Sequence, residues 1–424
     1  MIYVSLVCCI LLFALFSHRN LILVNPYTVF SISFFYYNFF IPIIFNSLDD
    51  ATISVSVYKI AVDSETIARV ALLNFAAFAG FTLGYRLINP MAETSPETPP
   101  SPLAAPFLYS VAIIAVFAVL FFSRQFYQPS VSYSENVYLS LLSVYTFSKT
   151  FIYSTISIYS IYKIFHSKKY LRWFAAPIAL LFFFAITTYD KNPILFAGFI
   201  GMCFLFRIFP NRQKSVLGAM VVLATIFLIT FIPAFSIYRQ TGVFEFHAPD
   251  ELNLSTVLGD ARGPFGVIAY VLTGYEQFDF PGVFESLFLW IPKFIWAARP
   301  DDMAQVFAQS VIPNWQPGQG LGFSPLAEAY IRVGSIFVAP YFLGLGILFA
   351  ALLRVFSRFF PPDLQIPMLM SGGAAGAFLI NRGATSGILT QSLQFWLPML
   401  AILALVSSLT ALYRAAGTTN RFRG

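Results

Sequence analysis

Long apolar runs, each ended by a short polar or charged stretch, recur along most of the chain. A helix needs about 20 mainly apolar residues to cross the hydrocarbon core of a bilayer. Runs that meet or nearly meet this length predict about eleven membrane-spanning helices, at residues 2–17, 21–45, 67–88, 104–122, 137–162, 173–189, 193–209, 215–238, 326–353, 364–381 and 386–412. The pattern therefore predicts an all-α integral membrane protein.

The composition excludes a soluble domain. Hydrophobic residues make up 58% of the 424 positions and charged residues 10%, whereas a soluble domain carries about 25% charged residues. The net charge of +6 would suggest nucleic acid in a soluble protein, but here we expect it to follow the membrane topology, and we predict no nucleic-acid partner. The three cysteines and three histidines lack metal or disulfide spacing, so we predict no metal and no cofactor.

Basic residues concentrate at alternate junctions between the apolar runs. These junctions carry 14 of the 25 basic residues but only three of the 19 acidic ones, Glu93, Glu97 and Asp363. Cytoplasmic loops of membrane proteins are enriched in Lys and Arg. The amino terminus is therefore predicted outside and the carboxyl terminus in the cytoplasm.

The same pattern divides the chain into four parts. Residues 1–238 form an amino-terminal bundle of about eight helices, with a Pro-rich cytoplasmic linker at 90–106. Residues 239–325 form one large outer loop, residues 326–413 a carboxyl-terminal bundle of about three helices, and residues 414–424 a cytoplasmic tail.

The outer loop holds no apolar run able to span, yet it is too long for a simple connection. Residues 252–276 predict one or two short helices at the membrane surface. Residues 281–300, bracketed by prolines and rich in Trp, predict an interfacial or re-entrant helix. The Gly- and Pro-rich residues 301–325 predict an irregular segment that leads into the next span.

Seven basic residues lie at or near the outer boundary of the predicted spans, where the positive-inside rule does not expect them. They are Lys191, Arg239, Arg262, Lys293, Arg299, Arg332 and Arg382. Guanidinium groups bind phosphate oxygens through paired N–H donors and stay charged at any pH, so the set predicts a pyrophosphate clamp. In the structural alternative, Arg332 pairs with Glu328 one helical turn earlier and others reach lipid headgroups. The sequence leaves both interpretations open.

Three segments carry a resemblance to a known family. They are LFLWIPKFIWAARPDDM (287–303), GFSPLAEAYIRVGSIF (322–337) and FLINRGATSG (378–387). Together they resemble the bacterial O-antigen polymerases, also called oligosaccharide repeat-unit polymerases. The features shared with that family are Trp296, Arg299-Pro300, Ser324-Pro325, Glu328, Tyr330, Gly334 and Arg382. One departure is Ala297, where the family often has Pro directly after the Trp.

The resemblance implies a GT-C-like architecture and a glycosyltransferase reaction. Such an enzyme transfers a growing glycan from undecaprenyl pyrophosphate onto a newly delivered lipid-linked repeat unit, at the periplasmic face of the inner membrane. Its substrates are undecaprenyl-pyrophosphate-linked oligosaccharides in the lipid bilayer. A flippase that delivers the units and a chain-length regulator are the expected partners.

That reaction needs a proton acceptor and surfaces that hold sugars. Glu328 is the first candidate for the general base and His247 the second. Further candidates on the outer side are Glu245, Asp260, Glu276, Asp301 and Asp302. A structural interpretation of Glu328, as an ion-pair partner or helix-start carboxylate, is equally open. Trp296, Trp315 and Tyr330 are candidates for stacking on sugars, although Trp296 also suits interface anchoring.

Other classes of protein remain as alternatives. An O-antigen ligase has a similar layout and differs in its acceptor. A lipid-linked oligosaccharide flippase would be expected to show an internal repeat and ionisable residues near mid-membrane, and Lys149 is the one residue that hints at this. A membrane scaffold without catalytic activity leaves the outer arginines unexplained.

Overall fold

The computed structural model describes residues 1–17, 21–46, 52–91, 98–121, 139–188, 190–223, 262–273, 296–315 and 320–421, with a few single positions between 227 and 291. The chain forms two compact units. Unit 1 comprises Met1–Asn89, Asn211–Ala351 and Gly376–Thr390, and unit 2 comprises Pro90–Pro210, Leu352–Ala375 and Gln391–Gly424. The division of the chain by membrane sidedness into 1–238, 239–325, 326–413 and 414–424 stays a prediction.

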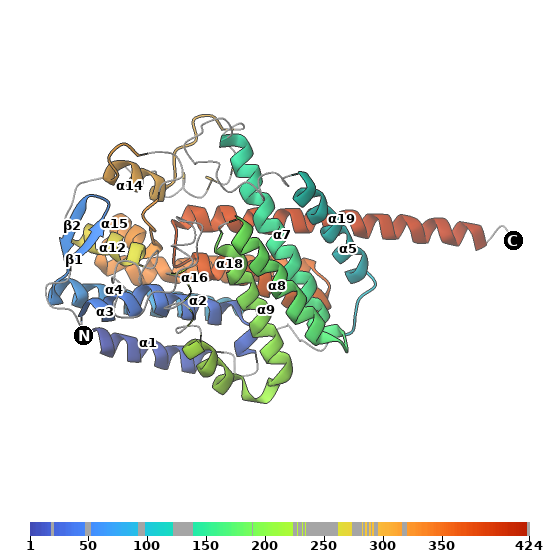
Figure 1. The fold of residues 1–424 in the computed structure, drawn as a ribbon, viewed down its shortest axis with the longest axis horizontal. Helices are drawn as coiled ribbons and strands as arrows, with labels where there is room; N and C mark the ends of the chain where they lie inside the picture. The colour runs from blue at the N-terminus through green and yellow to red at the C-terminus, as the bar shows by residue number, and fades with distance from the viewer. Residues whose placement is uncertain are drawn as a thin grey trace. The chain divides into compact units, whose positions relative to one another are not determined.

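The described residues are mostly helical (Figure 1). Among them, five helices are long and apolar enough to cross a membrane, at Pro26–Asn46, Ser64–Ile88, Tyr170–Thr188, Ser335–Phe359 and Thr385–Tyr413. The count is six if the consecutive helices Asn192–Ile208 and Pro210–Leu223 form one broken span, and Ile2–Phe16 and Ala104–Leu120 are shorter apolar helices. A multi-pass membrane protein is thus confirmed, and the total of eleven spans stays a prediction.

Unit 1 begins with helices whose side chains form an aromatic core. These helices are α1 (Ile2–Phe16), the 3-10 turn Ile22–Val24, α2 (Pro26–Phe35), the π-helical turn Tyr36–Phe40, α3 (Ile41–Asn46) and α4 (Ser64–Ile88). Pro26 at the first position and the Asn25 side chain, which accepts from the amide of Tyr27, start α2. The rings of Phe30 and Phe81 stack 3.7 Å apart, so part of the large Phe content fills the interior between α2 and α4.

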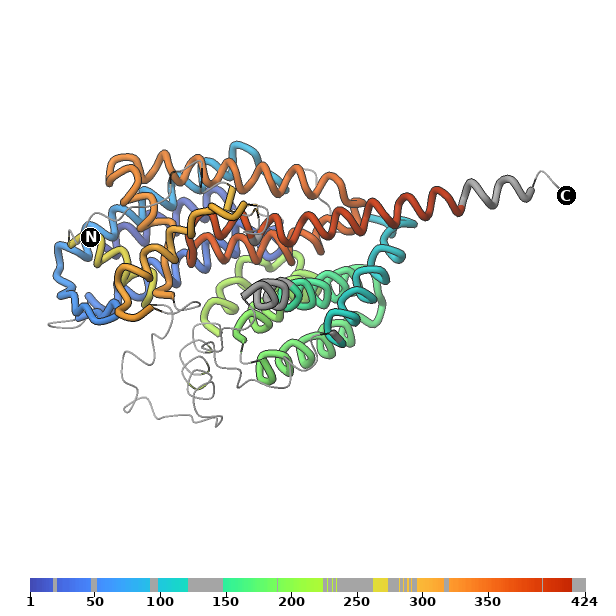
Figure 2. The backbone as a smooth tube through the Cα atoms, turned by 90° about the horizontal axis from the view of Figure 1, so that it is seen from above, coloured from blue at the N-terminus to red at the C-terminus, as the bar shows by residue number. Residues whose placement is uncertain are grey.

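Helix α4 packs closely against α16 (Val338–Phe359) through glycine (Figures 1 and 2). Gly80 and Gly84 of α4 face the backbone of Ala339 and Leu343, and Gly346 of α16 faces the carbonyl oxygen of Phe81. Glycines four residues apart allow two helix backbones to approach closely inside a membrane, where packing rather than the hydrophobic effect holds helices together.

A short β-hairpin makes the all-α prediction wrong at one place. Strands β1 (Thr52–Val55) and β2 (Tyr58–Ala61) pair antiparallel between α3 and α4. Helix α12 (Arg262–Leu272) packs on this hairpin, since Gly266 lies against Ile53 and Val55 (Figure 1). The alternating burial of TISV is a two-residue period, and such a short segment does not stand out beside runs of about 20 apolar residues.

Two predictions for residues 301–353 need correction. The segment expected to be irregular contains helix α14 (Met303–Val311), which buries Met303, Phe307 and Val311 on one face. The span expected at 326–353 is two helices, α15 (Pro325–Val333) and α16, joined by the 3-10 turn Ser335–Phe337. Gly334 ends α15 with φ 72° and ψ 175°, a conformation essentially restricted to glycine. Glu328 and Arg332 therefore precede the membrane-spanning helix and do not lie inside it.

Unit 2 is built mainly from α5 (Ala104–Phe121), α7 (Leu139–His166), α8 (Tyr170–Thr188) and α9 (Asn192–Ile208), which the 3-10 turn Pro210–Arg212 follows. Unit 2 also contains α17 (Pro362–Met368) and the π-helical turn Leu369–Gly373. The residues of α18 (Ala374–Leu379) and α19 (Thr385–Arg421) are divided between the two units, with Gly376–Leu379 and Thr385–Thr390 in unit 1. Lys149, inside the predicted fifth span, pairs with Asp190 at 3.2 Å. This ion pair gives Lys149 a structural role.

Candidate functional site

Helix α15 presents the acidic and basic residues of the resembling motif. Ser324 caps its start by accepting from the amide of Ala327 at 3.3 Å, and Pro325 occupies its first position. Leu326, Ala327 and Ala329 are buried with Glu328. Four consecutive helical residues point to all sides, so the first turns of this short helix are enclosed within unit 1.

Glu328 and Arg332 form a buried ion pair on α15. The Nε of Arg332 donates to Oε1 of Glu328 at 2.9 Å, and the two side chains are only 8% and 2% exposed. The predicted pairing one helical turn apart is confirmed. A guanidinium carries five N–H donors, and this bond uses the one on Nε.

The second oxygen of Glu328 is bound by the start of α19. The amide of Thr385, the first residue of α19, donates to Oε2 of Glu328 at 2.7 Å. The first amides of a helix have no partner within the helix and carry partial positive charge, which suits a carboxylate. The hydroxyl of Thr385 in turn bonds that of Tyr341 on α16 at 2.8 Å. Glu328 therefore joins three helices of unit 1.

The turn before α19 carries Arg382, another residue of the motif. Asn381, next to it, is buried. Its side-chain nitrogen Nδ2 donates to Oγ of Ser33 at 2.7 Å and to the carbonyl of Phe30 at 3.3 Å. These bonds hold the turn on α2. Arg382 thus lies three residues from the amide that binds Glu328, on an anchored segment.

Asp302 places a half-buried carboxyl near Glu328. It caps α14 by accepting from the amide of Gln305 at 2.7 Å. Burial raises the pKa of Asp302 above its usual range, and the charges of Asp301 and Glu328 raise it further, against hydrogen bonds that lower it. The side chain is thus favoured as the neutral acid more than a surface aspartate would be.

The guanidinium and the backbone amide of Arg299 donate hydrogen bonds to nearby backbone carbonyls. Its Nη1 donates to the carbonyls of Leu289 at 2.6 Å and Ile291 at 3.1 Å, and its amide closes a turn on Trp296 at 3.0 Å. The Nε is buried without a hydrogen-bond partner in the described part of the chain. Arg299 therefore connects the described positions Leu289, Ile291 and Trp296.

Arg262 begins helix α12, which reaches the entry of α15. A Cβ on Gly263 would lie 2.6 Å from the carbonyl oxygen of Leu321, and one on Gly322, where φ is 72°, would lie 3.1 Å from the Cα of Gly263. Only glycine permits this crossing of two backbones. It places the amino-terminal end of α12 beside the segment that leads into Glu328 and Arg332.

The other predicted residues do not all join this site. Lys191 belongs to unit 2, at the start of α9. Arg239, Lys293 and His247 lie outside the described residues, as do Glu245, Asp260 and Glu276. Tyr330 and Trp315 are half-buried in unit 1 and stay candidates for sugar binding together with Trp296.

Two contributors were missed from the sequence, Thr385 and Tyr341. Thr385 stands in the quoted segment FLINRGATSG, but no local pattern marks a backbone amide as a ligand of a carboxylate 57 residues away. Among the described residues, no three His, Cys, Asp or Glu side chains are grouped as a metal ion would require.

Comparison with protein families gives one result. The family model described as O-antigen polysaccharide polymerase Wzy matches residues 1–411. Neither the curated proteins nor the solved structures contain a match to the chain.

Proposed function

The chain belongs to the O-antigen polysaccharide polymerase Wzy family, and from this premise we propose the donor, the membrane face and the residues of its reaction. The growing glycan is carried by undecaprenyl pyrophosphate and is transferred to a lipid-linked repeat unit at the periplasmic face of the bacterial inner membrane. The acceptor hydroxyl oxygen bonds to the anomeric carbon of the donor, the bond from that carbon to the phosphate oxygen breaks, and undecaprenyl pyrophosphate leaves with the electron pair. The hydroxyl proton passes to a base.

The single observation that carries the proposal is the buried pair of Glu328 and Arg332 on the amide of Thr385. Pyrophosphate is already a good leaving group, so the enzyme has chiefly to orient two substrates and stabilise the charge that develops. A guanidinium held by a buried carboxylate keeps a fixed orientation, and little reorganisation is needed when the charge appears. Arg332 is therefore proposed as the central cation of the pyrophosphate clamp.

Glu328 is proposed to position Arg332. Both of its oxygens already accept hydrogen bonds, one from Arg332 and one from Thr385. Its assignment as general base stays a prediction, because a proton acceptor must reach the acceptor hydroxyl within hydrogen-bond distance. Asp302, on the neighbouring helix α14, is a second carboxyl for that role, and His247 is a third candidate.

Other basic residues of unit 1 are assigned to the same clamp as outer parts. Arg262 and Arg382 support this assignment, because α12 reaches the entry of α15 and the turn at Arg382 leads into Thr385. Arg239 and Lys293 keep their predicted role in pyrophosphate binding. The same role for Lys191, which belongs to unit 2, and for Arg299, whose Nη1 donates to two backbone carbonyls, stays a prediction from the sequence. Trp296, Trp315 and Tyr330 are proposed to stack on the sugars through their apolar faces. A flippase and a chain-length regulator are the proposed partners.

The test expresses the Arg332→Gln variant in a strain from which the native polymerase has been deleted. Its lipopolysaccharide is then analysed by electrophoresis. We expect polymerisation to fall by about 100-fold or more, as when one fixed donor of an oxyanion site is removed, so that core plus one repeat replaces the long ladder. Arg69→Gln is the matched control, because Arg69 forms the same i,i+4 pair with Glu65 but both side chains are more than half exposed. Immunoblotting of membranes checks that each variant is present at the level of the wild type.

The outcomes separate the rival functions. Loss of even the single repeat would indicate a ligase or a flippase. An unchanged ladder with Arg332→Gln, at normal protein level, would contradict the clamp. Glu328→Gln is expected to weaken polymerisation less than Arg332→Gln, since the guanidinium keeps its charge and loses only its orientation.

A further inference from the structure

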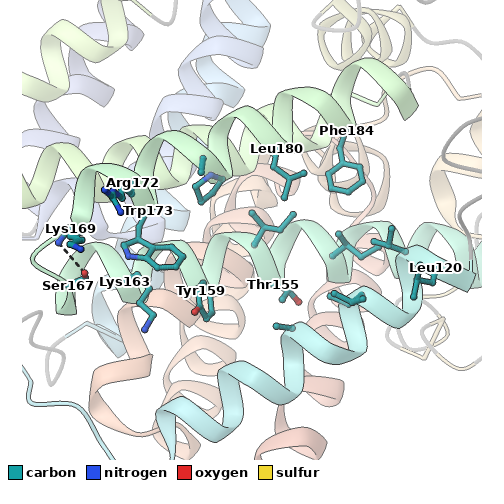
Figure 3. Close-up of a pocket in the computed structure, with 18 residues that line it drawn as sticks. Leu120, Thr155, Tyr159, Lys163, Ser167, Lys169, Arg172, Trp173, Leu180 and Phe184 are labelled. Carbon is teal, nitrogen blue, oxygen red and sulfur yellow. Dashed lines mark hydrogen bonds between the residues drawn. The ribbon is translucent and has the colours of Figure 1, made fainter.

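A groove outside the proposed site opens between three helices of unit 2 (Figure 3). Its walls come from α5, α7 and α8, and its cavity volume is about 800 Å³. All of its lining residues belong to unit 2, and none belongs to the set around Glu328 and Arg332. The groove therefore has no part in the chemistry proposed above.

One end of the groove is basic. Lys163, Lys169 and Arg172 line it around the turn between α7 and α8, and Figure 3 shows them gathered with Ser167 at that end. None of the described residues that line the groove is acidic. Three cations therefore converge on a single end of an otherwise uncharged groove, which suits an anionic group.

Aromatic rings hold one of these cations in place. The ammonium of Lys163 lies 5.5 Å from the ring centroid of Tyr159, 5.8 Å from that of Trp173 and 5.9 Å from that of Tyr162. Such contacts attract the cation without neutralising its charge. Aromatic residues with one polar edge are also the side chains enriched where a membrane meets water.

The rest of the groove is apolar. Away from the basic end, the walls carry Leu120 of α5 and Leu180 and Phe184 of α8, and Thr155 lies between the two ends (Figure 3). Ile152 of α7 also lines the groove. Leu120 and Leu180 are exposed. A soluble phosphate would leave these apolar walls uncovered, whereas hydrocarbon chains would cover them.

The length of the walls fits one leaflet of a bilayer. Eleven residues separate Ile152 from Lys163 on α7 and Trp173 from Phe184 on α8, which corresponds to about 16 Å at 1.5 Å per helical residue. Half of a hydrocarbon core of about 30 Å is about 15 Å. The charge pattern of the sequence assigns the turn between α7 and α8 to the cytoplasmic side.

We propose that this groove binds an anionic membrane phospholipid. The acyl chains lie along α5, α7 and α8, and the phosphate lies at Lys163, Lys169 and Arg172. Charge complementarity selects the headgroup, and the apolar walls select a lipid over a free phosphate. Basic pockets between membrane helices on the cytoplasmic side are a recognised way to bind anionic headgroups.

The first test uses the purified full-length protein in a neutral detergent, with native mass spectrometry to count bound phosphatidylglycerol against phosphatidylcholine. Each cation near a lipid headgroup contributes about fivefold in affinity. We therefore expect phosphatidylglycerol to bind preferentially, and Lys169→Gln with Arg172→Gln to weaken it on the order of 25-fold. Lys168→Gln is the matched control, because Lys168 is on the same turn, is exposed and does not line the groove. Equal binding of the two lipids, or an equal loss with Lys168→Gln, would overturn the proposal.

A second pair of variants tests the apolar walls. Ala176 lines the groove and Ala175 does not, although both are exposed on α8. Ala176→Trp is expected to fill the groove and reduce retained phosphatidylglycerol, while Ala175→Trp is expected to leave it unchanged. Water-soluble glycerophosphoglycerol should not displace the lipid. If it displaced the lipid completely, or if both Trp variants bound as the wild type does, the groove would not be a lipid site.

Discussion

At the scale of single residues, two aspartates cap helices in opposite surroundings. Asp302 caps α14 where it is half-buried, and this partial burial raises the pKa of its carboxyl. Asp63 caps α4 at the surface, where the hydrogen bond from the amide of Thr66 lowers the pKa of its carboxyl. Capping is thus the same interaction in both, and desolvation decides the sign of the pKa shift.

The pH dependence of stability should differ in sign between the two positions. Because folding raises the pKa of Asp302 above the usual 3.8, folding favours its protonated form. That contribution is fully present below about pH 3.8 and is lost as the pH rises through the raised pKa. Asp302→Asn keeps a capping oxygen without the charge. In detergent, the Tm of Asp302→Asn relative to that of the wild type should therefore increase as the pH rises above about 4.

Asp63→Asn is the control with the opposite expectation. The lowered pKa of Asp63 stabilises the wild type above the usual 3.8, and this stabilisation is lost as the pH falls through the folded pKa. The Tm of Asp63→Asn should therefore fall behind that of the wild type at neutral pH and approach it in acid. A Tm difference for Asp302→Asn that does not change with pH would contradict the electrostatic account.

At the scale of helices, the contact between α4 and α16 rests on positions without side chains. A Cβ on Gly84 would overlap the carbonyl oxygen of Leu343 and lie 2.9 Å from the amide nitrogen of Ile347. These atoms belong to helix backbone and cannot swing away as a side-chain end could. Gly344, on α16 itself, has no atom within 4 Å of its would-be Cβ.

Gly84→Ala and Gly344→Ala should consequently change stability in opposite directions. Ala is favoured over Gly in a helix by about 1 kcal/mol, which is the whole effect expected for Gly344→Ala. At Gly84 the overlap should outweigh that gain, with a net loss on the order of 1–3 kcal/mol. Thermal unfolding in detergent measures both. A Tm for Gly84→Ala at or above that of the wild type would show that the two helices can separate at little cost.

At the scale of the whole molecule, the distribution of basic residues predicts which segments share a side of the membrane, and the fold shows which of those segments are in contact. The positive-inside pattern places the turn between α7 and α8 in the cytoplasm, and places the segment between α3 and α4 outside. The structure puts a β-hairpin in that outer segment and packs α12, from the predicted outer loop, on it within unit 1. Segments predicted to share one side are therefore in contact.

Labelling with a membrane-impermeant maleimide checks this orientation. Val57, 64% exposed at the tip of the hairpin, should react as Val57→Cys in cells whose outer membrane alone is permeable. Lys168→Cys, on the turn between α7 and α8, should react only after lysis. The unmodified chain controls for the native cysteines, of which Cys9 and Cys203 are buried and Cys8 is half-buried. The reverse labelling would invert the predicted topology.

The sequence by itself determined several of the long apolar helices, because a run of about 20 apolar residues is a local property. The expected 67–88, 173–189 and 193–209 correspond to α4 at Ser64–Ile88, α8 at Tyr170–Thr188 and α9 at Asn192–Ile208. Spacing along one helix also sufficed for the pair of Glu328 and Arg332. The family could be identified because its motifs are contiguous in the sequence.

Only the tertiary structure decided what surrounds that pair. The amide of Thr385 reaches Glu328 from α19, the hydroxyl of Tyr341 reaches Thr385 from α16, and the carboxyl of Asp302 lies near Glu328 at the start of α14. No local period encodes contacts at these separations. The hairpin on α12 and the crossing of Gly263 with Gly322 are likewise long-range contacts. Apolar periodicity specifies which segments enter the membrane, but packing between segments specifies which backbone groups are left to bind a buried carboxylate.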